Sequence, residues 1–171
     1  MKWLRVWAMP NKDTFSVAPI GAFVKRYLGE STASVDPFAR NKRWATVTND
    51  LDPGTGAEHH FDAEDFLGLM RLEGRMFDLA IFDPPYSPRQ IAECYKGFGR
   101  TVTTKDTQSS VLYARARDAL VPVLAPEAVV LTFGWSTNGM GKKHGFEIEE
   151  IMLVAHGGAH NDTICMAERR L

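Results

Sequence analysis

Short apolar runs alternate along this chain with segments whose apolar residues recur every three or four positions. The short runs predict strands, and they cover residues 3–8, 34–35, 44–48, 59–61, 77–82 and 128–133. The longer spacing predicts helices, and it covers residues 19–28, 63–71, 90–96 and 110–120. Because strands and helices alternate and the strands are mostly apolar, the pattern predicts an α/β fold with a mainly parallel sheet.

The C-terminal part of the pattern differs from the rest. Residues 146–154 and 163–167 are two apolar runs, and the segment between them, 156–161, contains Gly157 and Gly158. Two strands joined by so short a glycine-containing segment form a hairpin. We therefore expect the sheet to end in an antiparallel pair.

Acidic residues follow several of the predicted strands. Asp36 and Asp83 each come directly after a predicted strand, and Asn49-Asp50 ends another. Asp62 stands between a run and a helix that it can cap. In parallel α/β sheets, ligands bind at the carboxyl ends of the strands. The three acids before Asp83 suit a ligand that carries an amino group, a ribose and an adenine.

The tetrapeptide Asp83-Pro84-Pro85-Tyr86 is the most informative of these strand ends. Each proline fixes its own φ, and Pro85 also keeps Pro84 extended. The Asp83 carboxylate and the Pro84 carbonyl then form two close acceptors, which match the two hydrogens of an exocyclic amine. Tyr86 offers a flat face on which a base can stack. An ordinary turn after a strand is the other interpretation.

Composition sets the broad class. A chain of 171 residues with 44% hydrophobic and 24% charged residues is typical of one soluble globular domain over residues 1–171. The net charge of −1 carries no overall nucleic-acid signature, so any basic surface must be local. Two cysteines, Cys94 and Cys165, fit a reducing cytoplasm. Lys2 and Arg5 interrupt the apolar start, so we expect neither a signal peptide nor a membrane span.

Together these residues resemble the amino-methyltransferases that use S-adenosylmethionine and methylate exocyclic amines of DNA bases. Asp83-Pro84-Pro85-Tyr86 is similar to their catalytic tetrapeptide in the form typical of adenine-N6 enzymes. The resemblance extends along nearly the whole chain and is greatest to small stand-alone adenine methylases of phages and prophages. It implies a Rossmann-like methyltransferase fold, S-adenosylmethionine as cofactor and DNA as substrate, with Asp83, Pro84, Pro85 and Tyr86 as catalytic residues.

The resemblance also implies which residues hold the cofactor. Thr14-Phe15-Ser16 resembles the segment around the methionine end, and Asp36-Pro37-Phe38 resembles the first strand end. Asn49 and Asp50 stand where the family places an acid for the ribose hydroxyls. Asp62 and Ala63 resemble the segment whose acid approaches the adenine amine.

The chain departs from the family after Ala39. A glycine-rich turn and a helix are expected there, but Arg40-Asn41-Lys42-Arg43 leads almost directly into Trp44, so we predict that this helix is missing. A separate target-recognition domain is also absent from the pattern. Residues 87–117 are the substitute candidate, with six basic residues against two acidic ones; a solvated helix-loop-helix is the plainer interpretation.

Other segments admit other functions. His156, His160 and Asp162 are of types that bind metals, although a hairpin turn explains them more simply. Residues 139–144 resemble a phosphate-binding loop loosely, without the full spacing. Residues 133–138 follow a strand and can wall a base pocket, whereas Trp135 is equally compatible with the core. A methylase of RNA, of cytosine N4 or of a protein amide, and a non-catalytic nucleic-acid-binding relative, remain alternatives.

Overall fold

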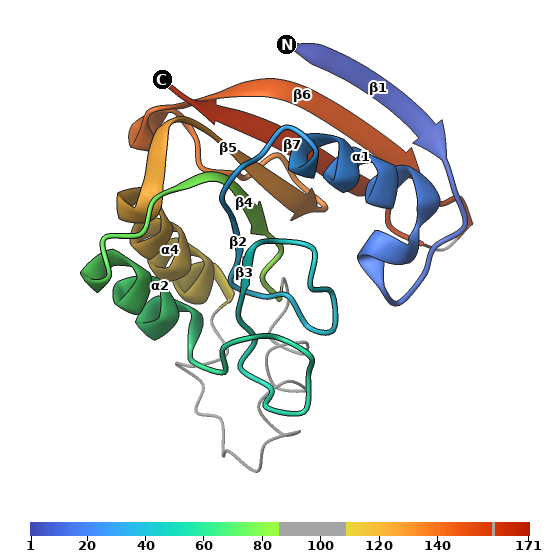
Figure 1. Cartoon of the computed structure of the whole chain (residues 1–171). Helices are drawn as coiled ribbons and strands as arrows, with labels where there is room; N and C mark the ends of the chain where they lie inside the picture. The colour runs from blue at the N-terminus through green and yellow to red at the C-terminus, as the bar shows by residue number, and fades with distance from the viewer. Residues whose placement is uncertain (86–108, 159) are drawn as a thin grey trace.

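A computed structural model describes residues 1–85, 109–158 and 160–171 of the chain. Its seven strands form one sheet in the order β1-β6-β7-β5-β4-β2-β3 (Figure 1). The strands are β1 (Lys2–Trp7), β2 (Ser34–Asp36), β3 (Val47–Thr48), β4 (Phe77–Phe82), β5 (Leu124–Gly134), β6 (Phe146–Ala155) and β7 (Thr163–Arg170). The helices are α1 (Ala18–Leu28), α2 (Ala63–Leu72) and α4 (Ser109–Leu120), with short 3-10 turns η1 (Thr14–Ser16), η2 (Val121–Val123) and η3 (Lys142–His144).

Strand directions confirm the predicted fold class. β2, β3, β4 and β5 pair in parallel, whereas β7 runs antiparallel between β5 and β6. The expected C-terminal hairpin is therefore present. β1 adds to β6 in parallel at the far edge of the sheet, so the chain begins on one edge and crosses to the opposite side for β2.

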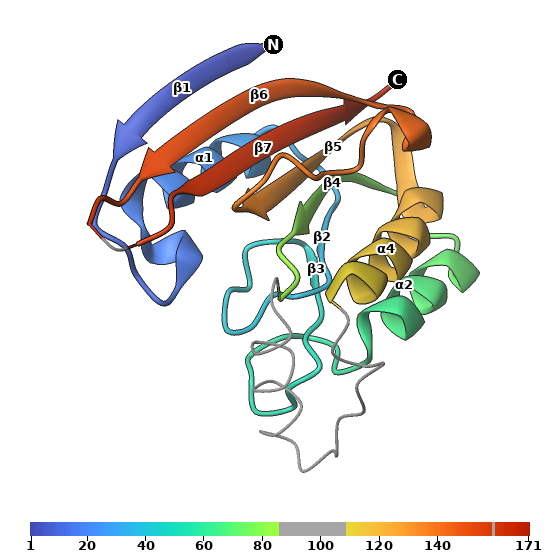
Figure 2. The ribbon, with the colours of Figure 1, turned by 180° about the vertical axis from the view of Figure 1, so that it is seen from behind.

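Helices cover the two faces of the sheet. Leu79 and Ile81 of β4 point into a core formed with α1, whereas Ala80 and Phe82 point into a second core formed with α2 and α4. This alternation follows from the two-residue period of a strand. Figures 1 and 2 show α1 on one side of the sheet and the α2–α4 pair on the other.

The described helices begin and end close to where the pattern places them, whereas the helix predicted over residues 90–96 lies outside the described residues. Pro19 stands in the first turn of α1, where its missing N–H is not needed, and Gly29 follows the last helical residue. Asp62 caps α2, since its Oδ1 accepts a hydrogen bond of 3.0 Å from the Glu64 N–H. Within the described ranges, no helix combines the length and apolar character needed to cross a lipid bilayer.

Two predicted strands are shorter than the sequence indicates. Residues 44–48 yield only β3, because Thr46 exchanges side-chain hydrogen bonds with Ser34 in place of backbone pairing. Residues 59–61 yield only one parallel bridge, between Asn49 and His59. The Phe61 N–H does not extend this pairing, because it donates to the Asn49 side chain at 3.0 Å. Polar side chains therefore end both ladders early.

A buried carboxylate ties β1 and α1 to the sheet. Glu150 of β6 is 3% exposed, and its oxygens accept hydrogen bonds from Arg26 at 2.8 Å and Tyr27 at 3.1 Å. Lys2 of β1 lies 3.4 Å from the same carboxylate. Burial raises the pKa of Glu150, but the bonds and charge of Arg26 outweigh it and hold that pKa below its ordinary value.

Candidate functional site

The carboxyl ends of β2, β3 and β4 bring the predicted acids together. These strands are parallel neighbours in the sheet, so Asp36, Asp50 and Asp83 emerge at one edge. Their charges interact: Asp83 and Asp50 both raise the pKa of Asp36. The sequence placed each acid at the end of a strand, and the order of the strands brings the three acids to the same edge.

Asp36 is the most deeply placed acid of the cluster. It is 1% exposed, and its Oδ1 accepts a hydrogen bond of 3.0 Å from the Phe38 N–H. Burial raises the pKa of Asp36 well above its ordinary value, and this effect exceeds the opposing backbone bond. No ion pair joins Asp36 to a cation within the described part of the chain. A cationic ligand group would relieve this cost.

The turn after β2 has the predicted departure from the family pattern. Residues 37–46 contain no helix, and Arg40 takes a left-handed φ of 53°. Asp50 supports this turn, because its Oδ2 accepts the Arg40 N–H at 2.9 Å and its Oδ1 accepts the Asp52 N–H at 2.9 Å. A side-chain carboxylate thus stabilises the turn that replaces the glycine-rich turn and its helix.

Asn49 lies inside the protein. Its side chain is fully buried and bonds the carbonyls of Pro37 and Phe61 and the N–H of Phe61, at 3.0–3.1 Å. All three contacts are to backbone, so Asn49 holds the two neighbouring strand ends together. In the described structure these bonds join the turn after β2 to the segment at Phe61.

The other predicted cofactor residues lie around this edge. Asp62 is half-buried at the start of α2 and Ala63 is buried behind it. Phe15, in η1, is 8% exposed and stacks on Trp44 with a ring separation of 5.6 Å, so its side chain belongs to the core. Neighbouring Ser16 is exposed and donates to Asp13 at 2.7 Å.

Asp83-Pro84-Pro85 leaves the end of β4 directly beside Asp36. Asp83 is half-buried and Pro84 is buried, so the turn is anchored by the sheet. Below it Phe82 packs edge-on against Phe38 at 5.7 Å and against Tyr113 at 5.1 Å. Tyr86, the predicted stacking residue, and residues 87–108 of the basic segment lie outside the described residues.

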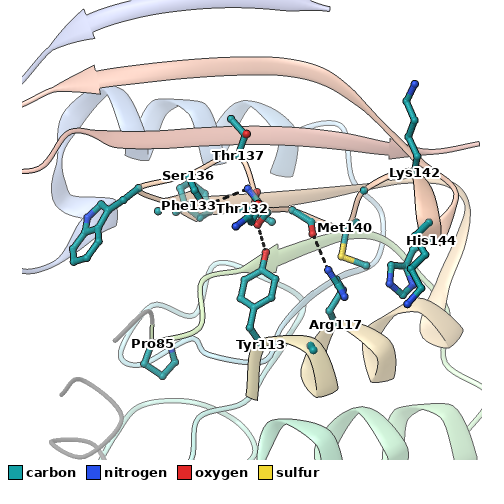
Figure 3. Close-up of a pocket in the computed structure, with 17 residues that line it drawn as sticks. Pro85, Tyr113, Arg117, Thr132, Phe133, Ser136, Thr137, Met140, Lys142 and His144 are labelled. Carbon is teal, nitrogen blue, oxygen red and sulfur yellow. Dashed lines mark hydrogen bonds between the residues drawn. The ribbon is translucent and has the colours of Figure 1, made fainter. Parts of the chain in front are cut away.

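Pro85 also lines a cavity of about 550 Å³ (Figure 3). Its walls are α4, the end of β5 and the loop from 135 to 144. The lining includes Pro85, Tyr113, Arg117, Thr132, Trp135 and the stretch Lys142-Lys143-His144. Trp135 is 60% exposed, so it is part of the rim and the alternative placement in the core is wrong. Aromatic and basic groups thus lie together next to the acidic turn.

The loop that walls this cavity is held by side chains that the sequence analysis did not single out. Buried Glu168 of β7 accepts the N–H groups of Met140 at 2.6 Å and Gly141 at 2.9 Å. Tyr113 and Arg117 of α4 donate to the carbonyls of Asn138 and Gly139 (Figure 3). The available signal for Glu168 was an acid directly after the apolar stretch Ile164–Ala167 of β7.

Metal binding at the β6–β7 turn finds no support. The ring of His156 has Nδ1 2.8 Å from the Ala8 carbonyl oxygen and Nε2 2.9 Å from the Thr163 hydroxyl. The Asp162 carboxylate accepts the His156 backbone N–H at 3.1 Å. Across the residues that the structure describes, no group of three or more potential ligands could hold a metal ion.

Comparison with known proteins agrees with this arrangement at the level of the fold. No protein-family profile matches the sequence. No curated protein matches it either. Among solved structures, the N-methyltransferase NodS from Bradyrhizobium japonicum WM9 is similar, with a TM-score of 0.62, 11% identity, and coverage of 94% of this chain and 99% of NodS.

Two further structures show the same similarity. TrmN from Thermus thermophilus has a TM-score of 0.58 and 13% identity, with 91% of this chain and 49% of TrmN covered. NSun6 from Pyrococcus horikoshii, solved with the ligand SFG, has a TM-score of 0.54 and 14% identity over 85% of this chain and 50% of its own. The chain thus spans about half of these two proteins and nearly all of NodS. The chain therefore shares the fold of these solved structures, among them the N-methyltransferase NodS.

Proposed function

We propose that this protein is a methyltransferase that transfers the methyl group of S-adenosylmethionine to the N6 amine of adenine in DNA. The observation that carries the proposal is the position of the Asp83-Pro84-Pro85 turn. It leaves the central strand β4 beside the acid at the end of β2, on a methyltransferase fold. Asp83 is thus next to the buried acid Asp36, and Pro85 of the same turn lines the cavity.

The acidic edge fits the proposed cofactor. Buried Asp36 suits the ammonium group of the methionine part, since a cation would offset the cost of its ionised form. Half-buried Asp50 suits the ribose hydroxyls, and Asp62 suits the adenine amine. A structure of NodS contains S-adenosyl-L-homocysteine, the product of such a cofactor. When bound, S-adenosylmethionine would supply a methyl group activated on a sulfonium.

The cavity fits a flipped base and its flanking phosphates. Its volume of about 550 Å³ is within the range of small-ligand sites. Adenine N6 lies inside the base stack of a duplex, so a base must be extruded before it can reach Asp83. Exposed Lys142 and Lys143 stand at the rim, where they suit the DNA backbone.

Positioning supplies most of the proposed catalysis. The Asp83 carboxylate and the Pro84 carbonyl would accept the two N6 hydrogens, which draws the nitrogen lone pair out of conjugation with the ring. The nitrogen then becomes the nucleophile, and the methylated amine loses its proton readily, so no strong base is required. Tyr86 would stack on the base. Holding the amine in this geometry lowers the barrier through orientation and electrostatics.

The test is a methyl-transfer assay with labelled S-adenosylmethionine on unmethylated DNA and on single-stranded RNA, followed by nucleoside analysis. We expect N6-methyladenine in DNA. Asp83→Ala should reduce transfer by about 1,000-fold or more, because an electrostatic and orienting contact to the reacting nitrogen is lost. Binding of S-adenosylhomocysteine by this variant, measured by calorimetry, should change little.

The matched control is Asp65→Asn, an exposed carboxylate on α2. It removes one negative charge away from the turn and should leave transfer unchanged. Full activity of Asp83→Ala on DNA would overturn the assignment. Methylation of RNA alone would move the substrate to the related amino-methyltransferases, and absence of cofactor binding at millimolar concentration would favour a non-catalytic relative.

A further inference from the structure

Strand β1 is an open edge with an unusual surface. Among the described residues it pairs with β6 alone, and it stands at the end of the strand order. Figures 1 and 2 show it along the outer border of the sheet. Edge strands of this kind usually carry short or strongly charged sequences that prevent pairing with other chains. Here the strand reads Lys-Trp-Leu-Arg-Val-Trp.

The direction of the backbone groups on β1 follows from its pairing with β6. The Ala8 N–H donates to the Ala155 carbonyl at 3.1 Å, so the even-numbered residues direct their backbone groups towards β6. Because these groups alternate along a strand, the N–H and C=O groups of Trp3, Arg5 and Trp7 face outward. β1 therefore offers a row of donors and acceptors to another strand.

Its side chains are also exposed. Trp3 is 59% exposed and Trp7 is 64% exposed, and both lie on the same face as Arg5 because strand residues alternate. On the other face, Val6 packs against the α1 core, whereas Leu4 remains 41% exposed. Exposed large apolar side chains grouped on an unpaired edge mark a contact surface.

We propose that β1 pairs with β1 of a second copy of this chain, in antiparallel orientation about a two-fold axis. Directly opposed residues in such a pair must lie on the same face, so their numbers must sum to an even value. In the register where the two numbers of each opposed pair add up to eight, Leu4 lies opposite Leu4 and Trp3 lies opposite Arg5 of the second copy. Each copy then contributes one guanidinium to the other's indole, a favourable cation–π arrangement.

Chemical complementarity selects the second copy and this register. A sum of ten would instead place Arg5 against Arg5, and directly opposed like charges are unfavourable. The charge of Lys2 is already compensated by Glu150 at 3.4 Å, so it does not repel a second strand. β1 contains no acidic residue that could pair with Arg5. The indole of Trp3 in the second copy is therefore a suitable partner for the Arg5 guanidinium.

The area of the contact sets its strength. Two half-exposed tryptophans per copy offer together roughly 400–600 Å², and the leucines and backbone bring the total near the ~1,000 Å² of the smallest specific interfaces. We therefore expect a dimer in the micromolar range. Because β1 runs parallel to β4, antiparallel pairing directs the two candidate sites towards opposite ends of the dimer. Each site then acts independently of the contact.

Analytical ultracentrifugation of the whole chain at several micromolar concentrations tests the proposal. The wild type should show a monomer–dimer equilibrium. Leu4→Lys and Leu4→Glu each place two like charges opposite one another, so each should raise the dissociation constant by about tenfold or more. An equimolar mixture of the two variants should restore dimers, since lysine then faces glutamate. Leu72→Lys is the control, because Leu72 is 88% exposed on α2 and far in sequence from the edge.

Two results would overturn the proposal. One is a wild type that stays monomeric over the whole concentration range. The other is a dimer that both Leu4 variants leave intact. Methyl transfer by the Leu4 variants reports separately on the proposed function, because the contact contributes no residue to either site.

Discussion

At the scale of single residues, burial of Asp36 sets the chemistry of the acidic edge. A carboxylate that is 1% exposed and close to two other acids is costly to ionise. Such a residue lowers the stability of the fold unless a bound ligand stabilises its ionised form. Buried groups with perturbed pKa values are for this reason typical of functional sites. The proposed role of Asp36 in cofactor binding would account for this burial.

Asp36→Asn should make the free protein more stable at neutral pH, by about 1–2 kcal/mol, because it removes a buried charge. The folded pKa of Asp36 is raised, so the wild type is most stable below the ordinary carboxyl pKa and loses stability as pH rises towards the raised value. The gain in stability from Asp36→Asn should therefore be small at acidic pH and larger at neutral pH. Urea denaturation of wild type and variant at acidic and neutral pH measures both effects. The same variant should bind S-adenosylhomocysteine more weakly. An effect of Asp36→Asn on stability that is the same at acidic and neutral pH would contradict this account of Asp36.

At the scale of elements, the loop after β5 depends on one crossing contact. Gly139 lies so close to β7 that a Cβ there would stand 1.8 Å from Glu168 Oε2. The Glu168 carboxylate in turn binds the Met140 and Gly141 N–H groups. The wall of the cavity is therefore fixed by a β7 side chain, and the absence of a side chain at position 139 is what allows this contact.

Gly139→Ala should destabilise the protein by about 1–3 kcal/mol, because the added methyl group displaces either the loop or the buried carboxylate. Thermal unfolding measures the change, and the methyl-transfer assay should show reduced activity because the wall of the cavity moves. Gly68→Ala on α2 is the control, since nothing lies within 4 Å of a Cβ there and alanine favours helix by up to ~1 kcal/mol. Equal effects of the two substitutions would show that the contact with Glu168 is unimportant.

At the scale of the whole molecule, the α1 face of the sheet is one continuous core. It joins α1 to side chains of β4, β5, β6 and β7, and Cys165 of β7 is fully buried within it. Burial raises the pKa of the Cys165 thiol, and the charge of Asp83 adds to this. The thiol is therefore both shielded and protonated in the folded protein, so its reactivity reports on opening of the core.

Cys165 should react with a thiol reagent in the native protein at least about 100-fold more slowly than in the denatured protein, because opening of the core requires global unfolding. Mass spectrometry of the peptide that contains Cys165 measures the rate independently of Cys94. Added S-adenosylhomocysteine should slow the reaction further if it binds the folded state only. Native labelling at the denatured rate would show that this core opens locally.

The sequence by itself determined most of the described elements and the positions of the acids at strand ends. Its hydrophobic periodicity predicted α1, α2, β4 and the C-terminal hairpin, because residues on one face of a strand or helix must be buried together. The acids at the ends of strands followed from the same periodicity, and so did the missing helix after Ala39, since too few residues separate two strands there.

Only the tertiary structure decided which residues meet. Sheet order brought Asp36 beside Asp83 and placed Glu168 behind the loop at Gly139, contacts between segments far apart in the chain. Phe15 and Asn49 are buried because Phe15 stacks on Trp44 and the Asn49 side chain donates to the Pro37 carbonyl. Residues of β1 form an edge because, among the residues that the structure describes, β1 is the last strand on its side of the sheet. Local sequence pattern carries none of this, since spatial neighbours are set by how strands pair across the whole sheet.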